Sequence, residues 1–540
     1  MIDKRTIIIG ALVAIVALPF ILRPKQPALE KSDVTLVIIT PHNEAIRSEF
    51  GRGFREWYRA RTGKSVLLDW RIVGGTSDIT RYLEAEYIAS FQNYWTGKLG
   101  RSWSAEIQAG FTNPKLKPDA PAVVRESRKV FLASDVTCGI DLFFGGGSYD
   151  FIRQAKAGRL IPTHLLQTHP DWFTDAVIPQ TFAGEAYWDP DGLWFGNVLS
   201  TYGMLYNKDS LARIGIAQPP RQWDDLKDPK YRGEIALADP TKSSSMATAF
   251  SNVIQQNIQR RLAALQAAAG GKQTAALEAQ AVREGWVAGL QLIQLIGANA
   301  RYFTDSAQKP PIDVAQGDCA IGIVIDFYGR AQAEVTAQRA DGSARLGFVT
   351  PRGGTVNSVD PIGLLRGAPN RDVAEAFIEY TLSMEGQKLW NFKPGTPGGT
   401  VRFALRRLPV RKDFYAHQEW EKNRSDPEAA PYEDEDHLIS HPEWTGGIFR
   451  EMAFVIGAMS LDTHDELVTA WKEIIAAGMP PQAVAKMSDM SIISYERTNG
   501  AIHQAFSSKD KVDELRIANE ISGAFRKQYR EAAELARAGK

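Results

Sequence analysis

Three short strand-like runs, separated by polar turns and helical patterns, constrain the fold of this chain most strongly. They cover Val34–Thr40, Val66–Val73 and Gly139–Phe144. The first, Val34–Thr40, is continuously apolar, which is typical of a strand that is buried on both faces. Between the first two, Ala45–Thr62 repeats its apolar residues at helical spacing and is followed by Gly63, which is suited to a helix C-cap. Alternating strands and helices with short turns predict a parallel α/β sheet.

A second unit with the same alternation follows. It begins within Leu199–Tyr206, and the long Asn252–Ala298 stretch is rich in alanine and glutamine, which favour helix. The segment Gly353–Val359 then returns the chain to the first unit, and Arg371–Phe392 has an amphipathic helical pattern. Further strands are predicted at Glu234–Ala238, Cys319–Ile325, Leu346–Thr350 and Pro361–Leu365.

The N-terminus predicts export. Thr6–Leu22 carries no charge over 17 residues, which is near the lower limit for a membrane span and long for the apolar part of a signal peptide. We therefore expect residues 1–24 to be a signal-anchor or transmembrane segment, with an uncleaved anchor favoured over a cleaved signal, and residues 25–33 to be a linker. Either alternative places the rest of the chain in the periplasm or on the outer face of the cytoplasmic membrane.

Charge and motifs exclude several classes of protein. The 63 basic residues equal the 63 acidic ones, whereas nucleic-acid binders usually carry a basic excess. No GxSxG, HExxH, Walker A or CxxC pattern occurs, and the eight histidines do not cluster at metal-ligand spacing. Cys138 and Cys319 are too few for a disulfide framework. We therefore predict no catalytic residues, no metal ligands, no cofactor and no nucleic-acid partner.

Four segments resemble, in order, the substrate-binding proteins of ABC importers, in the group that binds iron(III), thiamine, polyamines and phosphorylated solutes. They are the strand–turn–helix start that ends at Thr62-Gly63, DLFFGGGSYDFIRQAKAGRLIP, YGMLYNKDSL…WDDLKDPKYRGEIALADPTKSSS, and VAQGDCAIGIVIDFYG with DPIGLLRGAPNRDVAEAFIEYTLSMEGQKLW. The resemblance implies a two-lobed, type II periplasmic-binding-protein fold with two crossover strands and a ligand cleft that closes by hinge motion. It also implies a small-molecule ligand, and ABC permease and ATPase subunits as partners.

The resemblance also divides the chain, which at 540 residues is too long for one core. It spans residues 34–392 apart from 91–130, where prolines, glycines and two tryptophans interrupt the alternation. The predicted divisions are lobe 1 at 34–202 with an insertion at 91–130, lobe 2 at 203–352, a return to lobe 1 at 353–392, and a largely helical extension at 393–540.

Ligands of α/β sheets bind at the carboxyl ends of strands, on loops and helix N-termini. This rule selects residues on four loops that follow strands, and one further residue, Ser306, on a fifth loop. The candidate ligand-binding residues are His42, Asn43, Gly75, Thr76, Ser77, Asp78, Ser243, Ser244, Ser245, Ser306, Asp326, Phe327 and Tyr328. Thr76, Ser77 and the Ser243–Ser245 triplet would offer hydroxyls and N–H groups to an anion, or could only cap helices. His42 could equally be a satisfied surface histidine, and Phe327 a core residue.

The iron-binding branch of the resembled family uses a histidine, an acidic residue and two adjacent tyrosinates. Here Phe327 stands where the first tyrosine would be, leaving Tyr328 alone. Since Fe(III) prefers anionic oxygen ligands, the loss of one phenolate disfavours ferric iron. We therefore expect an anionic or phosphorylated solute. Iron(III), thiamine or a polyamine remains an alternative ligand, and a membrane-tethered solute sensor or scaffold remains an alternative function.

Overall fold

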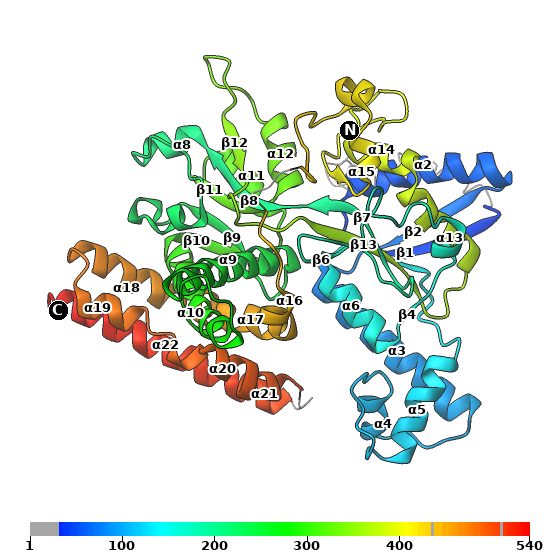
Figure 1. The fold of residues 1–540 in the computed structure, drawn as a ribbon, viewed down its shortest axis with the longest axis horizontal. Helices are drawn as coiled ribbons and strands as arrows, with labels where there is room; N and C mark the ends of the chain where they lie inside the picture. Colours follow the sequence, from blue (N-terminus) through cyan, green and yellow to red (C-terminus); the bar gives the residue numbers. More distant parts are fainter. Residues whose placement is uncertain (1–31, 434–436, 508–510) are drawn as a thin grey trace, which may run out of the picture.

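The computed structural model describes residues 32–433, 437–507 and 511–540, which form two lobes, each built around its own β-sheet (Figure 1). The predicted membrane segment at 1–24 and nearly all of the linker at 25–33 lie outside the described residues. Within the described ranges, none of the helices is both long and apolar enough to cross a membrane.

The sheet of lobe 1 has the strand order β14-β7-β13-β3-β1-β2, with β4 also paired to β13. As predicted, β1 runs parallel to β2 and to β3. The sheet is not parallel throughout, because β13 is antiparallel to both β3 and β7. The strands are β1 Val34–Ile39, β2 Val66–Arg71, β3 Leu142–Phe144, β4 Leu160–Ile161, β7 Phe195–Ser200, β13 Ser358–Leu365 and β14 Leu408–Pro409.

The sheet of lobe 2 has the order β10-β9-β11-β8-β12. Its centre is parallel, β9 with β10 and β11, and β8 is antiparallel to β11 and β12. The strands are β8 Tyr202–Asn207, β9 Ile235–Ala238, β10 Ala300–Thr304, β11 Ile321–Ile325 and β12 Leu346–Val349. A small hairpin of β5 Thr181–Phe182 and β6 Glu185–Ala186 stands apart from both sheets.

Two crossovers join the lobes, as expected for this fold. β7 of lobe 1 continues into β8 of lobe 2 through the single residue Thr201. The second crossover leads from β12 through residues 350–357 into β13, where Ser358 pairs with Ser200. The crossovers therefore lie side by side, which confirms the two-lobed α/β fold with two crossovers. The region where they pass between the lobes is here called the hinge.

Helices cover both sheets. The first, α2, has Asn43 as its N-cap and Gly63, at φ 72°, as its C-cap, as the sequence predicts. In lobe 1 the helices are α2 Glu44–Thr62, α3 Thr76–Asn93, α6 Ser148–Ala157, α7 Leu165–Thr168, α13 Arg371–Leu382 and α14 Met384–Asn391. In lobe 2 they are α8 Lys208–Arg213, α9 Ser244–Ala268, α10 Ala275–Asn299, α11 Lys309–Gln316 and α12 Asp326–Val335.

The segment predicted as an insertion is helical. A π-turn at Tyr94–Lys98 follows α3 directly, and α4 Ala105–Gly110 and α5 Ala122–Ala133 come after it. Phe91 stacks on Phe111 with ring centroids 4.7 Å apart, and Phe131 meets both rings edge-on. Figure 1 shows α4 and α5 at the far end of α3, away from both sheets.

The chain after residue 393 contacts both lobes. β14 pairs with β7 in the sheet of lobe 1, and α15 Lys412–Tyr415 follows it. The predicted helical extension is confirmed further on, where α17 packs on α9 and both α18 and α20 pack on α10 of lobe 2 (Figure 1). These helices are α16 Pro442–Thr445, α17 Phe449–Ile456, α18 His464–Ala476, α19 Pro481–Met487, α20 Tyr495–Arg497, α21 His503–Ser507 and α22 Lys511–Arg537.

Candidate ligand-binding site

The loops that precede α3 in lobe 1 and α9 in lobe 2 touch across the boundary between the lobes. A Cβ placed on Gly75 would lie 3.0 Å from the carbonyl oxygen of Lys242. Thr76 begins α3 and Ser244 begins α9, so two helix N-termini lie near each other on opposite sides of the boundary. Each carries the positive end of a helix dipole and unsatisfied N–H groups, a combination that favours an anion.

Of the predicted residues at the start of α3, some cap the helix and others lie at the boundary between the lobes. The Asp78 carboxylate accepts a hydrogen bond from the Gly75 N–H at 3.2 Å and pairs with Arg81 at 2.5 Å. Asp78 thus stabilises its own helix. Thr76 is buried against Gly146, and Ser77 is half-buried.

In α9, Ser243 is the N-cap, and its hydroxyl accepts from the N–H of Met246 at 3.3 Å. Ser244 and Ser245 follow in the first turn and are half-buried. Neither of their hydroxyls has a hydrogen-bond partner among the residues that the structure describes. Of the serine triplet, these two are therefore the residues that can donate to a ligand.

Two other predicted residues serve local structure. The side chain of Asn43 accepts from the Ile46 N–H at 3.1 Å as the N-cap of α2. Ser306 is exposed, and its hydroxyl accepts from the Gln308 N–H at 3.3 Å within a turn. A helix cap accounts for the side chain of Asn43, and a turn accounts for that of Ser306.

His42 is buried rather than a surface residue. Its ring meets Phe144 edge-on, with centroids 4.6 Å apart, and it is only 6% exposed. Burial lowers the pKa of His42 to about 3, against the opposing effect of the Asp360 carboxylate. The ring is therefore neutral at physiological pH. Among the described residues its Nε2 has no hydrogen-bond partner.

Gly145 makes this position of His42 possible. Its φ is 89°, a conformation that L side chains rarely adopt, and a Cβ there would lie 2.4 Å from Nε2 of His42. We expect Gly145→Ala to lower the free energy of unfolding by about 2 kcal/mol, from backbone strain and displacement of the ring. Urea denaturation measures this change.

Gly147→Ala is the matched control, since Gly147 has φ −98° and no atom lies within 4 Å of a Cβ placed there. It should change the free energy of unfolding by less than about 0.5 kcal/mol. Equal losses in the two variants would contradict the role assigned to Gly145.

The start of α12 brings the other three predicted residues to the same boundary. Asp326 is fully buried and pairs with Arg330 one turn later. Phe327 is buried and lies 4.2 Å from the ring of Tyr328, centroid to centroid. Burial raises the pKa of Tyr328 to about 12, although Arg407 acts in the opposite direction. Tyr328 therefore remains a neutral phenol at neutral pH.

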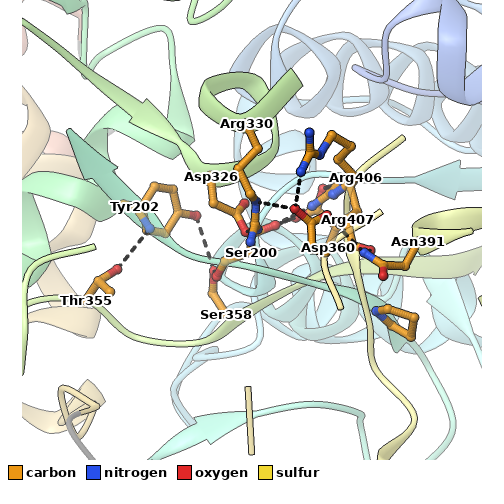
Figure 2. Close-up of polar contacts among 12 residues, drawn as sticks. Ser200, Tyr202, Asp326, Arg330, Thr355, Ser358, Asp360, Asn391, Arg406 and Arg407 are labelled. Atoms are coloured by element: carbon orange, nitrogen blue, oxygen red, sulfur yellow. Dashed lines mark hydrogen bonds and ion pairs between the residues drawn. The ribbon is translucent and has the colours of Figure 1, made fainter. Parts of the chain in front are cut away.

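Arg407 and Asp360 form a charged pair at the centre of the site (Figure 2). This pair was not predicted from the sequence. Nη1 of Arg407 lies 2.7 Å from Oδ2 of Asp360, and Nη2 donates to the hydroxyl of Ser200. The guanidinium lies over the Phe327 ring, 4.4 Å from its centroid, and over Trp390 at 5.4 Å. Arg407 is fully buried. It thus contacts both crossover strands and lobe 2 together.

A second set of charges adjoins this pair (Figure 2). Asp426 accepts from Arg406 at 2.7 Å and from the side-chain amide of Asn391 at 3.2 Å. Arg330 lies 3.9 Å from the same carboxylate. A signal in the sequence was the Arg406-Arg407 pair directly before the apolar Leu408–Val410, but no local pattern connects it to the hinge.

The candidate site combines hydrogen-bond donors with charged and aromatic groups. Hydroxyls and helix N-termini from both lobes lie on one side, and a buried guanidinium with aromatic rings lies at the hinge. In the described part of the chain, no three His, Cys, Asp or Glu side chains are grouped so as to hold a metal ion.

A two-lobed α/β protein with paired crossovers and polar loops facing each other across the hinge has the architecture of a solute-binding protein. Comparison with known families agrees, since the family of bacterial extracellular solute-binding proteins matches residues 140–414. The match covers half of the chain, and the chain belongs to this family.

The curated relatives are distant and are matched only in part. An uncharacterized protein of Haemophilus influenzae is 26% identical over 46% of this chain and 60% of its own length. Iron uptake protein A2 of Synechocystis is 26% identical over 39% of this chain and 54% of its own length. The phosphoglycerate transport regulatory protein PgtC of Salmonella typhimurium is 23% identical over 35% and 39%. The chain thus spans about half the length of the curated relatives it matches.

Among solved structures, the periplasmic binding protein AfuA of Actinobacillus pleuropneumoniae aligns at 18% identity and a TM-score of 0.43, over 73% of this chain and 99% of that one. Iron-bound HitA of Pseudomonas aeruginosa aligns at 16% identity and a TM-score of 0.44, over 78% and 99%.

Proposed function

We propose that this protein is the substrate-binding component of an ABC importer, located in the periplasm or on the outer face of the cytoplasmic membrane. It captures a small anionic or phosphorylated solute between its lobes and presents it to permease and ATPase subunits. The protein is not an enzyme on this proposal. Its N-terminal segment would export it and, if uncleaved, hold it at the membrane.

The pair of helix N-termini at the boundary carries the proposal. Gly75 and Lys242 are in contact, so one anionic group between Thr76–Ser77 and Ser244–Ser245 would meet donors from both lobes. Such a group would stabilise the closed lobes, which is the differential binding that hinge closure requires. A phosphorylated ligand is also consistent with the name of one relative, the phosphoglycerate transport regulatory protein PgtC.

Ferric iron remains the second candidate, because the iron uptake protein A2 of Synechocystis is a relative at similar identity. The buried, neutral His42 and the single phenol of Tyr328 offer fewer anionic donors than Fe(III) prefers. Thiamine and polyamines would instead need carboxylates, and Asp326 and Asp78 are already paired with arginines.

A ligand screen by thermal shift on residues 32–540 tests the proposal. The panel contains phosphorylated sugars, phosphonates, carboxylates, polyamines, thiamine, and Fe(III) with and without phosphate. A ligand at a hundredfold excess over its Kd should add about 3 kcal/mol of stability by mass action. Stabilisation by Fe(III) alone would replace the anionic solute as the ligand, and stabilisation by nothing in the panel would favour a solute sensor or scaffold.

The double substitution Ser244→Ala/Ser245→Ala is expected to weaken binding of the anionic ligand from that screen about tenfold or more, since two hydroxyl donors are lost. Isothermal titration calorimetry measures the affinity. Ser243→Ala is the control, because its hydroxyl caps α9. It should lower the free energy of unfolding by about 1 kcal/mol and leave affinity nearly unchanged. Unchanged affinity in the double variant would make both serines structural residues.

A further inference from the structure

The chain beyond the family match crosses the hinge once more. Residues 415–433 and 437–445, here called the tail, run from lobe 1 to lobe 2 after the two crossover strands have already joined them. Three observations show that the tail is bonded to both lobes and to the hinge.

One set of contacts of the tail is centred on Asp426, which is fully buried. On the side of lobe 1 it accepts from Asn391 of α14 and from Arg406. On the side of lobe 2 its carboxylate lies 3.9 Å from Arg330 of α12. Arg330 in turn pairs with Asp326, the first residue of the ligand-facing turn of α12. Asp426 therefore helps to position that turn from outside the family region.

The tail also follows the second crossover. The side-chain amide of Asn357 donates to the carbonyl of Pro431 at 2.7 Å. The N–H of Leu438 donates to the carbonyl of Thr355 at 3.1 Å. The tail is thus hydrogen-bonded to the chain that must bend when the lobes separate.

The last contacts come from two adjacent residues that bond to opposite lobes. The N–H of Ser440 donates to the carbonyl of Ala183 in lobe 1 at 2.7 Å. The N–H of His441 donates to the side-chain oxygen of Gln255 on α9 of lobe 2 at 2.8 Å. Gln255 also donates to Thr445 at 3.0 Å. Separation of Ala183 from Gln255 must therefore break or strain one of these bonds.

We infer that the tail is a third connection between the lobes, which restrains the hinge and sets how far the protein opens without ligand. The inference rests on the proposed function in one respect, namely that the lobes close on binding a solute. With the tail bonded to both lobes, the ligand-free protein populates mainly nearly closed conformations. Less free energy is then needed to close the lobes around a ligand, so the tail raises the apparent affinity for the ligand.

Distance measurements by double electron–electron resonance test this inference without any ligand. Spin labels are attached to Lys64→Cys in lobe 1 and Lys272→Cys in lobe 2, both exposed positions, in a Cys138→Ala background. Asp426→Asn removes the charge that joins Arg406 to Arg330. We expect it to raise the population of longer interlobe distances about tenfold, the effect of losing one charge-assisted hydrogen-bond set.

Two milder substitutions at the surface test the same inference if Asp426→Asn does not fold. Arg406, the lobe 1 partner of Asp426, also donates to Glu334 of α12 at 3.2 Å, and Glu334→Gln removes the charge from this contact. Gln259→Ala removes the hydrogen bond that α9 donates to the Ile439 carbonyl of the tail. The two combined should shift the distances in the same direction. Glu284→Gln is the control, because its partner Arg261 lies in the same lobe.

Distances that remain unchanged in folded Asp426→Asn and in the double surface variant would overturn the inference. A shift equal to that of Glu284→Gln would do so as well. The ligand screen can fail while the distances still shift, so the two proposals are tested separately.

Discussion

Arg407→Ala is expected to lower the free energy of unfolding by about 3–5 kcal/mol, the largest single effect expected of any residue in the site. Arg407 is fully buried and paired with Asp360, so its removal leaves a carboxylate uncompensated at the hinge. The substitution also removes a guanidinium that lies between the rings of Phe327 and Trp390. Urea denaturation followed by circular dichroism measures the change.

Two variants make this expectation specific. Arg402→Ala replaces an exposed arginine of the same segment, which should cost no more than about 0.5 kcal/mol. Arg407→Gln combined with Asp360→Asn removes both charges, and it should cost less than the sum of the two single substitutions because neither charge is left unpaired. A loss for Arg407→Ala no larger than that for Arg402→Ala would refute the importance of the buried pair.

Asp150→Asn is expected to stabilise the protein at pH 7 by up to about 3 kcal/mol. Asp150 is 5% exposed, and its Oδ2 has no hydrogen-bond partner among the described residues. Burial raises the pKa of Asp150 from 3.8 to about 6, against the opposing effect of Arg153. The folded protein therefore holds the proton more tightly than the unfolded chain does. A difference of two units in pKa corresponds to about 3 kcal/mol.

The sign follows from proton linkage. Below about pH 4 the carboxyl is protonated in both states and costs nothing. Between about pH 4 and pH 6 the unfolded chain loses the proton first, so this group makes stability fall as the pH rises, and above pH 6 the loss is complete. The difference in stability between Asp150→Asn and the parent protein should thus grow over that interval and then stay constant.

Asp372→Asn provides the comparison, because Asp372 is an exposed aspartate in the first turn of α13, as Asp150 is in the first turn of α6. It should show a small loss of stability at pH 7, about 0.3–1 kcal/mol, from the helix dipole. If Asp150→Asn behaved in the same way, the buried carboxyl would have to be stabilised by a partner that lowers its pKa.

Much of the fold could be predicted because it is encoded locally. Strands β1, β3 and β11 are continuous apolar runs, β2 is rich in apolar residues, and the caps of α2 are visible as Asn43 and Gly63. Strand β10 was missed, because Ala300–Thr304 continues an alanine-rich helix without a turn residue. The antiparallel placement of β13 was missed for another reason: strand direction depends on the path of the chain between the lobes.

The site was predicted less completely than the fold. The rule that ligands bind at strand ends selected the loops that do meet at the boundary, at Gly75, Ser244 and Phe327. It could not separate Ser243, Asn43 and Asp78, whose side chains cap helices, from neighbours that face the boundary. The role of Arg407 could not be predicted from the sequence, since its partners Asp360 and Ser200 are 47 and 207 residues away along the chain.

The continuity of α3 has a practical consequence. Its 18 residues extend about 27 Å as one straight rod from Thr76 to the aromatic cluster of the insertion. A fluorophore on an exposed insertion residue such as Lys117 would therefore follow the orientation of lobe 1 from a distance. Because it lies far from the hinge, a small rotation there would displace it by a large distance, and the label would leave every candidate ligand-binding residue unchanged.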